Sequence, residues 1–257
     1  MFKRIISIIL VLCFIVSLIS CSASKDMIKD NPENAIIGFV SGSNSELAAR
    51  SYAKEGSQLI GYNTLSDLLL AIENGYVNYG VLSDYECIVS ANAERKIEVY
   101  EECSYKIDLC AYFRNDSSEL RNEFNESIRK MKDNGKIDKI KDSEYNGITY
   151  HSPYTGEGNN ELKVICNPST DLFLYLLDDG SFAGIDAKVL ETFAEENEYS
   201  LSYVSVLDYD ELFSKLENGE GDMVMCACKS DEEKIEYYLA SDVYFTINFN
   251  LVTRKAV

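Results

Sequence analysis

Residues 66–82 read SDLLLAIENGYVNYGVL, and residues 210–226 read DELFSKLENGEGDMVMC. Both stretches begin with polar residues, carry apolar residues one helical turn apart, and continue through Glu-Asn-Gly into an apolar run. Each is typical of a capped amphipathic helix that stops at Asn-Gly and enters a buried strand. Because this helix-to-strand unit occurs twice, the sequence predicts two α/β lobes of related topology.

Apolar runs and helical periodicities extend this pattern on both sides of each copy. In the first half we expect strands at 36–40, 59–62, 77–82, 97–101 and 106–114, and helices at 45–55, 66–74, 85–93 and 118–141. In the second half we expect strands at 162–166, 201–206, 222–228 and 245–254, helices at 187–197 and 209–218, and a further segment at 173–177.

The composition indicates a folded, acidic protein with few catalytic groups. The chain has 257 residues, of which 46% are hydrophobic, so it can bury a full core. Its 24 basic and 43 acidic residues give a net charge of −19, which argues against nucleic acid as a partner. The single histidine, His151, leaves little basis for His-dependent catalysis or a His-ligated metal, and we expect no cofactor.

The amino terminus has the features of an export signal. Lys3-Arg4 precedes an apolar run over residues 5–19, which is too short to span a bilayer as a helix. The run ends in Leu18-Ile19-Ser20-Cys21, which resembles the lipobox of bacterial lipoproteins. We therefore expect lipidation of Cys21 and a protein anchored to the cell membrane on its extracellular or periplasmic side. An ordinary secretory signal with an incidental cysteine is the alternative.

Six further cysteines are expected to be buried core thiols, with a metal or disulfide role as the alternative. They are Cys87, Cys103, Cys110, Cys166, Cys226 and Cys228. On an extended strand Cys226 and Cys228 share one face and are too far apart to bridge readily.

Two segments carry a resemblance to a known family. The stretches LKVICNPSTDLFLYLLDDGSFAGIDAKVLETFAEE, LFSKLENGEGDMVM and SDVYFTINFNLVTRK lie within residues 161–255. They resemble the first half of the bacterial extracellular solute-binding proteins of family 3, the polar amino-acid receptors of ABC importers. The stretches IIGFVSGSNSE, LLLAIENGYVNYGVLSDY and YKIDLCAYFRNDSSELRNEFNESIRKMKDNGKIDKI lie within residues 35–147 and resemble the second half.

The two halves stand in the reverse of the usual order, so the chain is similar to a circular permutant; a truncated member of a tandem array is the alternative. The resemblance implies an α/β, two-lobed fold of the type II periplasmic-binding-protein kind. The expected organisation is a signal peptide at 1–20, a tether at 21–34, lobe 2 at 35–104, a return strand and helix packing on lobe 1 at 105–146, a linker at 147–160, and lobe 1 at 161–257.

Ligands of open parallel sheets sit beyond the carboxyl ends of the strands. Ser43, Asn44 and Ser45 follow the strand at 36–40 and can form an anion site at a helix N-terminus, or an ordinary helix cap. Asp84 follows the strand at 77–82 and can accept hydrogen bonds from a ligand amine, or cap the next helix. The resemblance implies the same two roles, capture of a carboxylate and of an amine.

In the other lobe the sequence departs from the family pattern Thr-x-Thr-x-x-Arg. Lys229 and Asp231 stand at the threonine positions, and Lys234 stands at the arginine position. A lysine does not reproduce the bidentate carboxylate clamp of an arginine. A ligand other than an ordinary α-amino acid and a receptor that has lost binding therefore both stay open.

Three further positions follow from the same comparison. Phe173 and Tyr175 align with the family's aromatic wall near the entrance of the site, and core packing is the alternative for each. Asp186 aligns with the aspartate of a Gly-Phe-Asp motif, where we expect capping of a helix start more than ligand contact.

These observations predict a receptor that captures a small polar, amino-acid-like solute for the permease subunits of an ABC importer or for a sensor. The alternatives are a ligand-free interaction domain and, with no GxSxG or GxGxxG motif present, a dehydratase-like enzyme on the same scaffold. We expect a monomer that crosses between lobes once, near 103–106, with Leu251 and Val252 beside residues 107–111. A swapped dimer is the rival arrangement.

Overall fold

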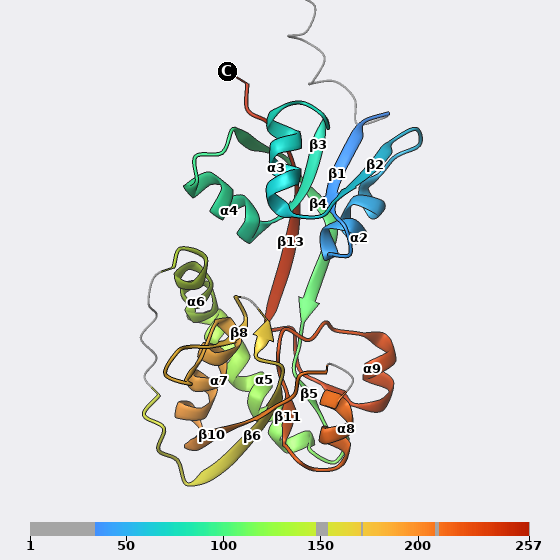
Figure 1. Ribbon diagram of the computed structural model, residues 1–257. Coiled ribbons are helices and arrows are strands. Elements are labelled where there is room, and N and C mark those ends of the chain that lie inside the picture. The colour runs from blue at the N-terminus through green and yellow to red at the C-terminus, as the bar shows by residue number, and fades with distance from the viewer. Residues whose placement is uncertain (1–33, 148–153, 171, 209–210, 257) are drawn as a thin grey trace, which may run out of the picture.

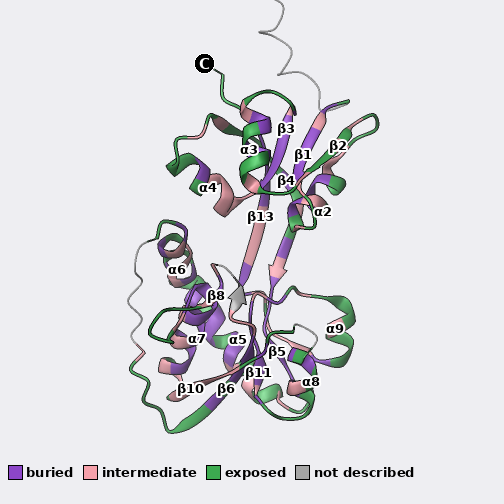
Figure 2. Ribbon diagram, in the orientation of Figure 1, coloured by how far each residue is buried: buried purple, intermediate pink, exposed green. Residues whose placement is uncertain are grey.

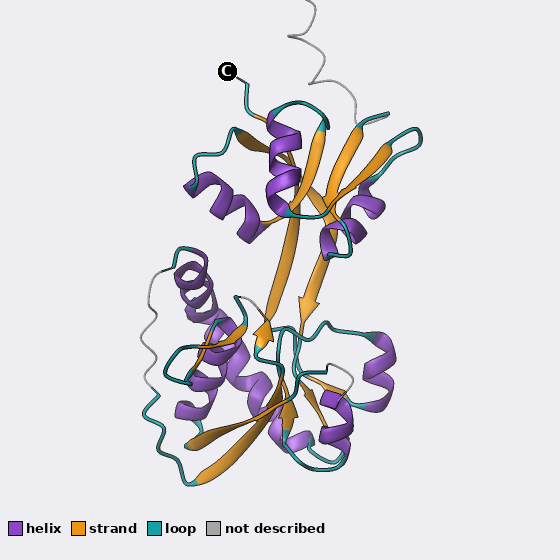
Figure 3. Ribbon diagram, in the orientation of Figure 1, coloured by secondary structure: helices purple, strands orange, loops and turns teal. Residues whose placement is uncertain are grey.

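The computed structural model describes residues 34–147, 154–170, 172–208 and 211–256. Within these residues the chain forms two α/β lobes joined by a pair of long strands (Figures 1 and 3), so the expected two-lobed α/β fold is confirmed. The expected signal peptide, the lipidation site Cys21, the tether up to residue 33 and His151 lie outside the described residues.

Lobe 2, the upper lobe in Figure 1, is built on a five-stranded sheet in the order β2-β1-β3-β13-β4. Strands β1, β2 and β3 are mutually parallel, and β13 runs antiparallel to both of its neighbours. The strands are β1 (Ile36–Val40), β2 (Gln58–Tyr62), β3 (Tyr79–Ser83), β4 (Ile97–Leu109) and β13 (Phe245–Arg254), and the helices are α2 (Asn44–Tyr52), α3 (Leu65–Glu73) and α4 (Asp84–Asn92).

Two glycines let α3 lie directly on this sheet. A Cβ on Gly38 of β1 would stand 2.6 Å from Leu68 Cδ1, and one on Gly80 of β3 would stand 2.3 Å from Ile72 Cδ1. Both distances are far shorter than van der Waals contact, so only glycine allows the apolar face of α3 to approach so closely. Leu68 and Ile72, the shared apolar positions of the repeat, are consequently fully buried.

Lobe 1 is built on the sheet β10-β6-β11-β5-β12, with a small sheet β7-β8-β9 beside it. The main strands are β5 (Tyr112–Phe113), β6 (Asn160–Cys166), β10 (Tyr199–Ser205), β11 (Met223–Val224) and β12 (Leu239–Ala240). The small sheet contains β7 (Ser169–Thr170), β8 (Leu174–Leu176) and β9 (Phe182–Ala183). The helices are α5 (Ser118–Asp133), α6 (Lys136–Tyr145), α7 (Ile185–Glu196), α8 (Glu211–Glu217) and α9 (Glu232–Tyr237).

Four expected elements need correction. The charged helix at 118–141 is two helices, because Gly135 adopts a left-handed φ of 70° between α5 and α6. The expected strands at 97–101 and 106–114 are one continuous strand, β4, followed by the short β5. The expected strand at 222–228 is reduced to β11, since the chain turns at Ala227, whose φ is 51°.

Two strands form the hinge, so the expectation of a single crossing is wrong. β4 carries the chain from lobe 2 to lobe 1 and β13 carries it back, and they pair from Phe245 opposite Leu109 to Arg254 opposite Ile97. Leu251 therefore lies opposite Glu101, several residues from the expected neighbours at 107–111. The difference arises because β13 continues into the sheet of lobe 2, where Leu251 is completely buried.

The largest apolar cluster runs through this hinge from one lobe into the other. It includes Ile37 and Leu251 in lobe 2, Phe113 and Phe193 in lobe 1, and Phe245 between them. Figure 2 shows this burial along the strands of both sheets. None of the described helices is long and apolar enough to cross a membrane.

Candidate functional site

Both sheets direct the carboxyl ends of their parallel strands at the other lobe. β13 enters lobe 2 from lobe 1 and pairs antiparallel with β3, so Ser83, opposite Phe249, is at the end of β3 nearer lobe 1. In lobe 1, β5 follows β4 away from the hinge and β11 is antiparallel to β5, so β11 and its parallel neighbour β6 run back toward lobe 2. The expected ligand loops therefore start from the facing edges of the two sheets.

The loop after β1 uses its polar groups to cap α2. Ser43 Oγ accepts the N–H of Ser45 at 3.1 Å, and Ser45 Oγ accepts the N–H of Val40 at 3.1 Å. The N–H of Gly42 donates to Glu46 Oε2 at 2.9 Å, which lowers the pKa of Glu46. The carboxylate of Glu46 thus occupies a backbone amide next to the expected anion site, whereas Asn44, the first residue of α2, is exposed.

Asp84 occupies the first turn of α4 and faces the hinge. Ser83 caps this helix, so the carboxylate of Asp84 is left for other partners. Its Oδ2 accepts from the amide of Asn248 at 3.0 Å, and its Oδ1 accepts from the amide of Asn250 at 2.7 Å. Each carboxylate oxygen has a second lone pair, so Asp84 can still accept from a ligand donor.

Aromatic side chains from both lobes meet beside Asp84. The ring of Tyr85 on α4 lies 5.4 Å from that of Tyr145 on α6, and this pair joins the lobes. The ring of Tyr145 lies 6.5 Å from that of Phe245 at the start of β13, and Phe245 lies 5.4 Å from Phe173. We call these four residues and Asp84 the interlobe cluster. Phe173 is buried and packs against Phe245, as expected if its role is core packing.

A second carboxylate lies at the edge of the interlobe cluster. Tyr175 donates its hydroxyl hydrogen to Glu144 Oε2 at 3.3 Å, which joins the small sheet to α6. Burial raises the pKa of Glu144, partly offset by this hydrogen bond. Burial also raises the pKa of Tyr145, with a smaller contribution from the charge of Asp84. Two carboxylates, tyrosine hydroxyls and aromatic faces therefore border the same region.

Six residues that contribute to this region were not expected from the sequence, among them Phe245 at the start of β13. Asn248 and Asn250 carry the clearest signal, because they interrupt an apolar strand on alternate positions and so share one face. Tyr85 comes close to Glu144 and Tyr145, two neighbours on α6, only through the packing of α4 against α6.

The three expected ligand residues after β11 are Lys229, Asp231 and Lys234. Their contacts are with residues outside the interlobe cluster. Asp231 caps α9 by accepting the N–H of Glu233 at 2.9 Å, and its own N–H donates to the hydroxyl of Tyr112. The Nζ of Lys234 stands 4.2 Å from the ring centre of Phe213, a cation–π contact within lobe 1. Lys229 is exposed and bridges Leu109 through its backbone.

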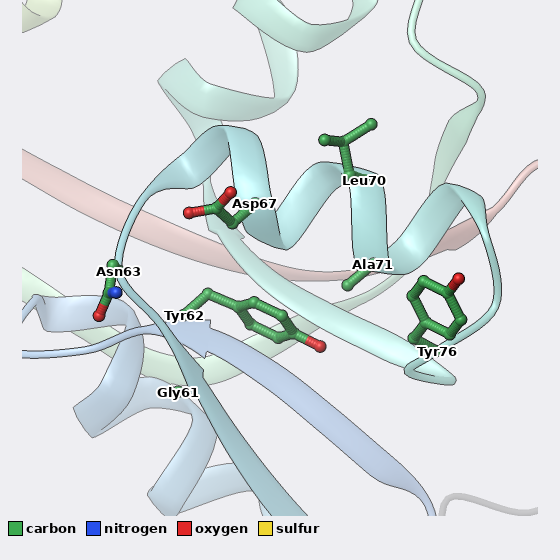
Figure 4. Close-up of a pocket in the computed structure, with 7 residues that line it drawn as sticks. All are labelled: Gly61, Tyr62, Asn63, Asp67, Leu70, Ala71 and Tyr76. Carbon is green, nitrogen blue, oxygen red and sulfur yellow. The ribbon is translucent and has the colours of Figure 1, made fainter.

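A surface pocket of about 390 Å³ lies elsewhere, on lobe 2 between β2 and α3 (Figure 4). Figure 4 shows the ring of Tyr62 pointing between the strand and the helix, with Asp67 and Tyr76 at opposite ends. Its lining is Gly61, Tyr62, Asn63, Asp67, Leu70, Ala71 and Tyr76, which includes none of the expected ligand residues.

Asp186 is a buried carboxylate that ties three elements of lobe 1 together. Its Oδ1 accepts the hydroxyl of Tyr244 at 2.7 Å and its Oδ2 accepts the N–H of Ala227 at 2.6 Å. Burial raises the pKa of Asp186 to about 7, and these two hydrogen bonds offset only part of the effect. The expected capping of a helix start is wrong, because α7 has no side-chain cap. Asp186 lies in the first turn of α7, and its carboxylate bonds to the turn at 227 and to the residue before β13.

No group of three or more histidine, cysteine, aspartate or glutamate side chains within the described residues is arranged to hold a metal ion. What the interlobe cluster offers is hydrogen-bond acceptors with negative charge and aromatic faces, a combination suited to a donor-bearing or cationic small molecule.

Comparisons with known proteins give one family match. Residues 162–257 match the family of bacterial extracellular solute-binding proteins, family 3. This segment corresponds to the part compared above with the first half of that family, whereas the resemblance of residues 35–147 stays a prediction. No curated protein matches the chain.

Similar solved structures are aligned over most of the chain at low identity. A phosphate-binding protein of a phosphate ABC transporter from Streptococcus pneumoniae TIGR4 shares 13% identity, over 86% of this chain and 88% of that one, with a TM-score of 0.45. A glycine betaine/carnitine/choline ABC transporter shares 11% identity, over 86% of this chain and 78% of that one, with a TM-score of 0.46. An ancestral cationic amino acid solute-binding protein shares 10% identity, over 87% of this chain and 82% of that one, with a TM-score of 0.40.

Proposed function

We propose that this protein is a solute receptor of the extracellular solute-binding kind, which holds a small polar ligand between its lobes. The observation that carries this proposal is the facing pair of carboxyl sheet edges, with Asp84 directed at the hinge from lobe 2. The family match of residues 162–257 supports the same function independently.

The proposed ligand bears an amine or another cationic donor group. Asp84 supplies a carboxylate with acceptor capacity remaining, and Glu144 adds a second carboxylate at the border of the interlobe cluster. Lys234, which stands at the position of the family arginine, contacts Phe213 instead. An arginine-type clamp for a ligand carboxylate is therefore left out of the proposal, and an ordinary α-amino acid is disfavoured relative to an amine without that group.

We further propose that the receptor is a lipoprotein, anchored through Cys21 outside the cell, that serves an ABC importer or a sensor. The basic pair, the apolar run and the lipobox-like tetrapeptide at residues 3–21 support the anchor. The order of the family-like segments, with the second half first, supports a circularly permuted arrangement of lobes.

The test is a thermal-stabilisation screen with polyamines, amino acids, quaternary amines and inorganic anions, followed by calorimetry with the compounds that bind. Asp84→Asn should weaken binding of an amine at least about tenfold, because a charged hydrogen bond is worth about 1.5–3 kcal/mol. The matched control is Asp67→Asn, which changes a carboxylate in the surface pocket of the same lobe. Equal loss in both variants would point to a general charge effect.

Three outcomes would replace the proposal. Binding that depends on Asp67 and not on Asp84 would move the site to the surface pocket. Stabilisation by no compound would favour an interaction domain, and conversion of a bound compound into product would favour an enzyme on this scaffold.

A further inference from the structure

Cys226 and Cys228 lie closer together than their spacing in the sequence suggests. Their sulfur atoms are 3.8 Å apart, and both residues are buried. On a regular strand two residues at this spacing have Cα atoms about 6.6 Å apart, at the upper limit for a disulfide. Here β11 has already ended, and Ala227 between them has a left-handed φ of 51°, which turns the chain and brings the two side chains together.

Hydrogen bonds on both sides hold this turn in place. The N–H of Ala227 donates to Asp186 Oδ2 at 2.6 Å, and the carbonyl of Cys228 accepts the N–H of Cys110 at 2.9 Å. A left-handed conformation is uncommon for alanine, so it persists because its surroundings fix it. The close approach of the two thiols is thus a property of the folded lobe.

We propose that Cys226 and Cys228 form a reversible disulfide, a modification site at the lobe 1 end of the hinge. The oxidant is a small-molecule disulfide. The thiolate of one cysteine attacks it, forms a mixed disulfide and releases one small thiol; the second cysteine then displaces the other. The new Sγ–Sγ bond forms as the small disulfide takes up two electrons, and the two cysteine protons leave with the small thiols or solvent.

Two other cysteines of lobe 1 could compete as disulfide partners for this pair. Cys110 and Cys166 belong to the same apolar cluster of lobe 1, and each supplies a rival partner. Among the described residues, however, the contact at 3.8 Å joins Cys226 to Cys228. The hydrogen bond between them, together with burial, raises the pKa of Cys226, so the thiol of Cys226 stays protonated while the lobe is folded. Oxidation should consequently require local opening and be accelerated by mild denaturant.

The test uses the full chain, reduced and then incubated with oxidised glutathione in dilute urea. After denaturation and alkylation, trypsin releases residues 216–229 as one peptide that contains Cys226 and Cys228 and no other cysteine. The expected result is that the peptide carries no alkyl group and has the mass of the reduced, unalkylated peptide less two hydrogens. Reduction with dithiothreitol should restore double alkylation.

Cys226→Ser and Cys228→Ser should each abolish the lighter peptide, whereas the control Cys103→Ser, a buried thiol on β4, should leave it unchanged. Three results would overturn the proposal: double alkylation of residues 216–229 in the wild type after oxidation, a stable glutathione adduct on that peptide, or its cross-link to a peptide carrying Cys110 or Cys166. The wild-type peptide decides the question even where a serine variant fails to fold.

Discussion

Replacing Asp186 by asparagine should change how the stability of the protein depends on pH. The carboxyl of Asp186 is completely buried, and its pKa rises from the ordinary 3.8 to about 7. The folded protein therefore holds this proton more tightly than the unfolded chain. Binding of this proton therefore adds to the free energy of unfolding. The contribution is fully present below pH 3.8 and is lost as the pH rises through about 7.

The magnitude follows from the two pKa values. Between pH 5 and pH 8 the free energy of unfolding should fall by about 2–3 kcal/mol through Asp186 alone. Asp186→Asn has no proton to lose in this range, so the difference in unfolding free energy between wild type and variant should change by that amount. Taking this difference removes the contributions of other groups, including Glu144, whose pKa burial also raises.

The assay is urea denaturation of wild type and Asp186→Asn at pH 5, 6, 7 and 8. Asp222→Asn is the matched control, because it also converts a carboxylate that accepts a backbone N–H into an amide, at a half-buried position. A wild-type minus Asp186→Asn difference that stays constant within about 0.5 kcal/mol from pH 5 to pH 8 would refute the reasoning.

The remaining predictions address the lobes, the sheet and the anchor. Tyr85→Ala should favour an open arrangement and raise the radius of gyration in X-ray scattering, since an aromatic pair is worth about 0.5–1.5 kcal/mol; Tyr100→Ala, which removes a ring pair within lobe 2, should not. Gly80→Ala should lower the free energy of unfolding by about 1–3 kcal/mol, and adding Ile72→Val, which removes the clashing methyl, should recover part of it. Cys21→Ser should release the protein from the membrane fraction, because lipid anchoring contributes roughly 0.8 kcal/mol per buried methylene; continued membrane retention would exclude acylation there.

Local sequence signals were sufficient where the neighbours that decide the structure are close in the chain. Thr64 caps α3 and Ser83 caps α4 through the backbone amide three residues ahead, and both starts were expected within one residue. The apolar strand Phe245–Arg254 was expected with the bounds that it has. What its sequence could not reveal is the partner, because β3 and β4 are more than one hundred residues away.

Distant contacts explain the misplaced or missed features. The run at 222–228 is apolar enough for a strand, yet the buried carboxylate of Asp186 binds the N–H of Ala227 and turns the chain there. The resemblance predicts Lys234 at the position of a ligand-binding arginine, and in the structure its ammonium group lies over the ring of Phe213. In both cases the deciding partner comes from another element, and no periodicity or spacing in the local sequence indicates it.

The hinge shows why a reversed order of halves is compatible with a complete two-lobed fold. Both strands that join the lobes belong to this chain, and β13 ends inside the sheet of lobe 2, between β3 and β4. β1, where the described part of lobe 2 begins, is in the same sheet, separated from β13 by β3. In the proposed permutation the break in connectivity thus falls within one lobe, between strands that the sheet already holds in place. Neither crossing is cut, so the lobes keep the connection through the paired strands β4 and β13.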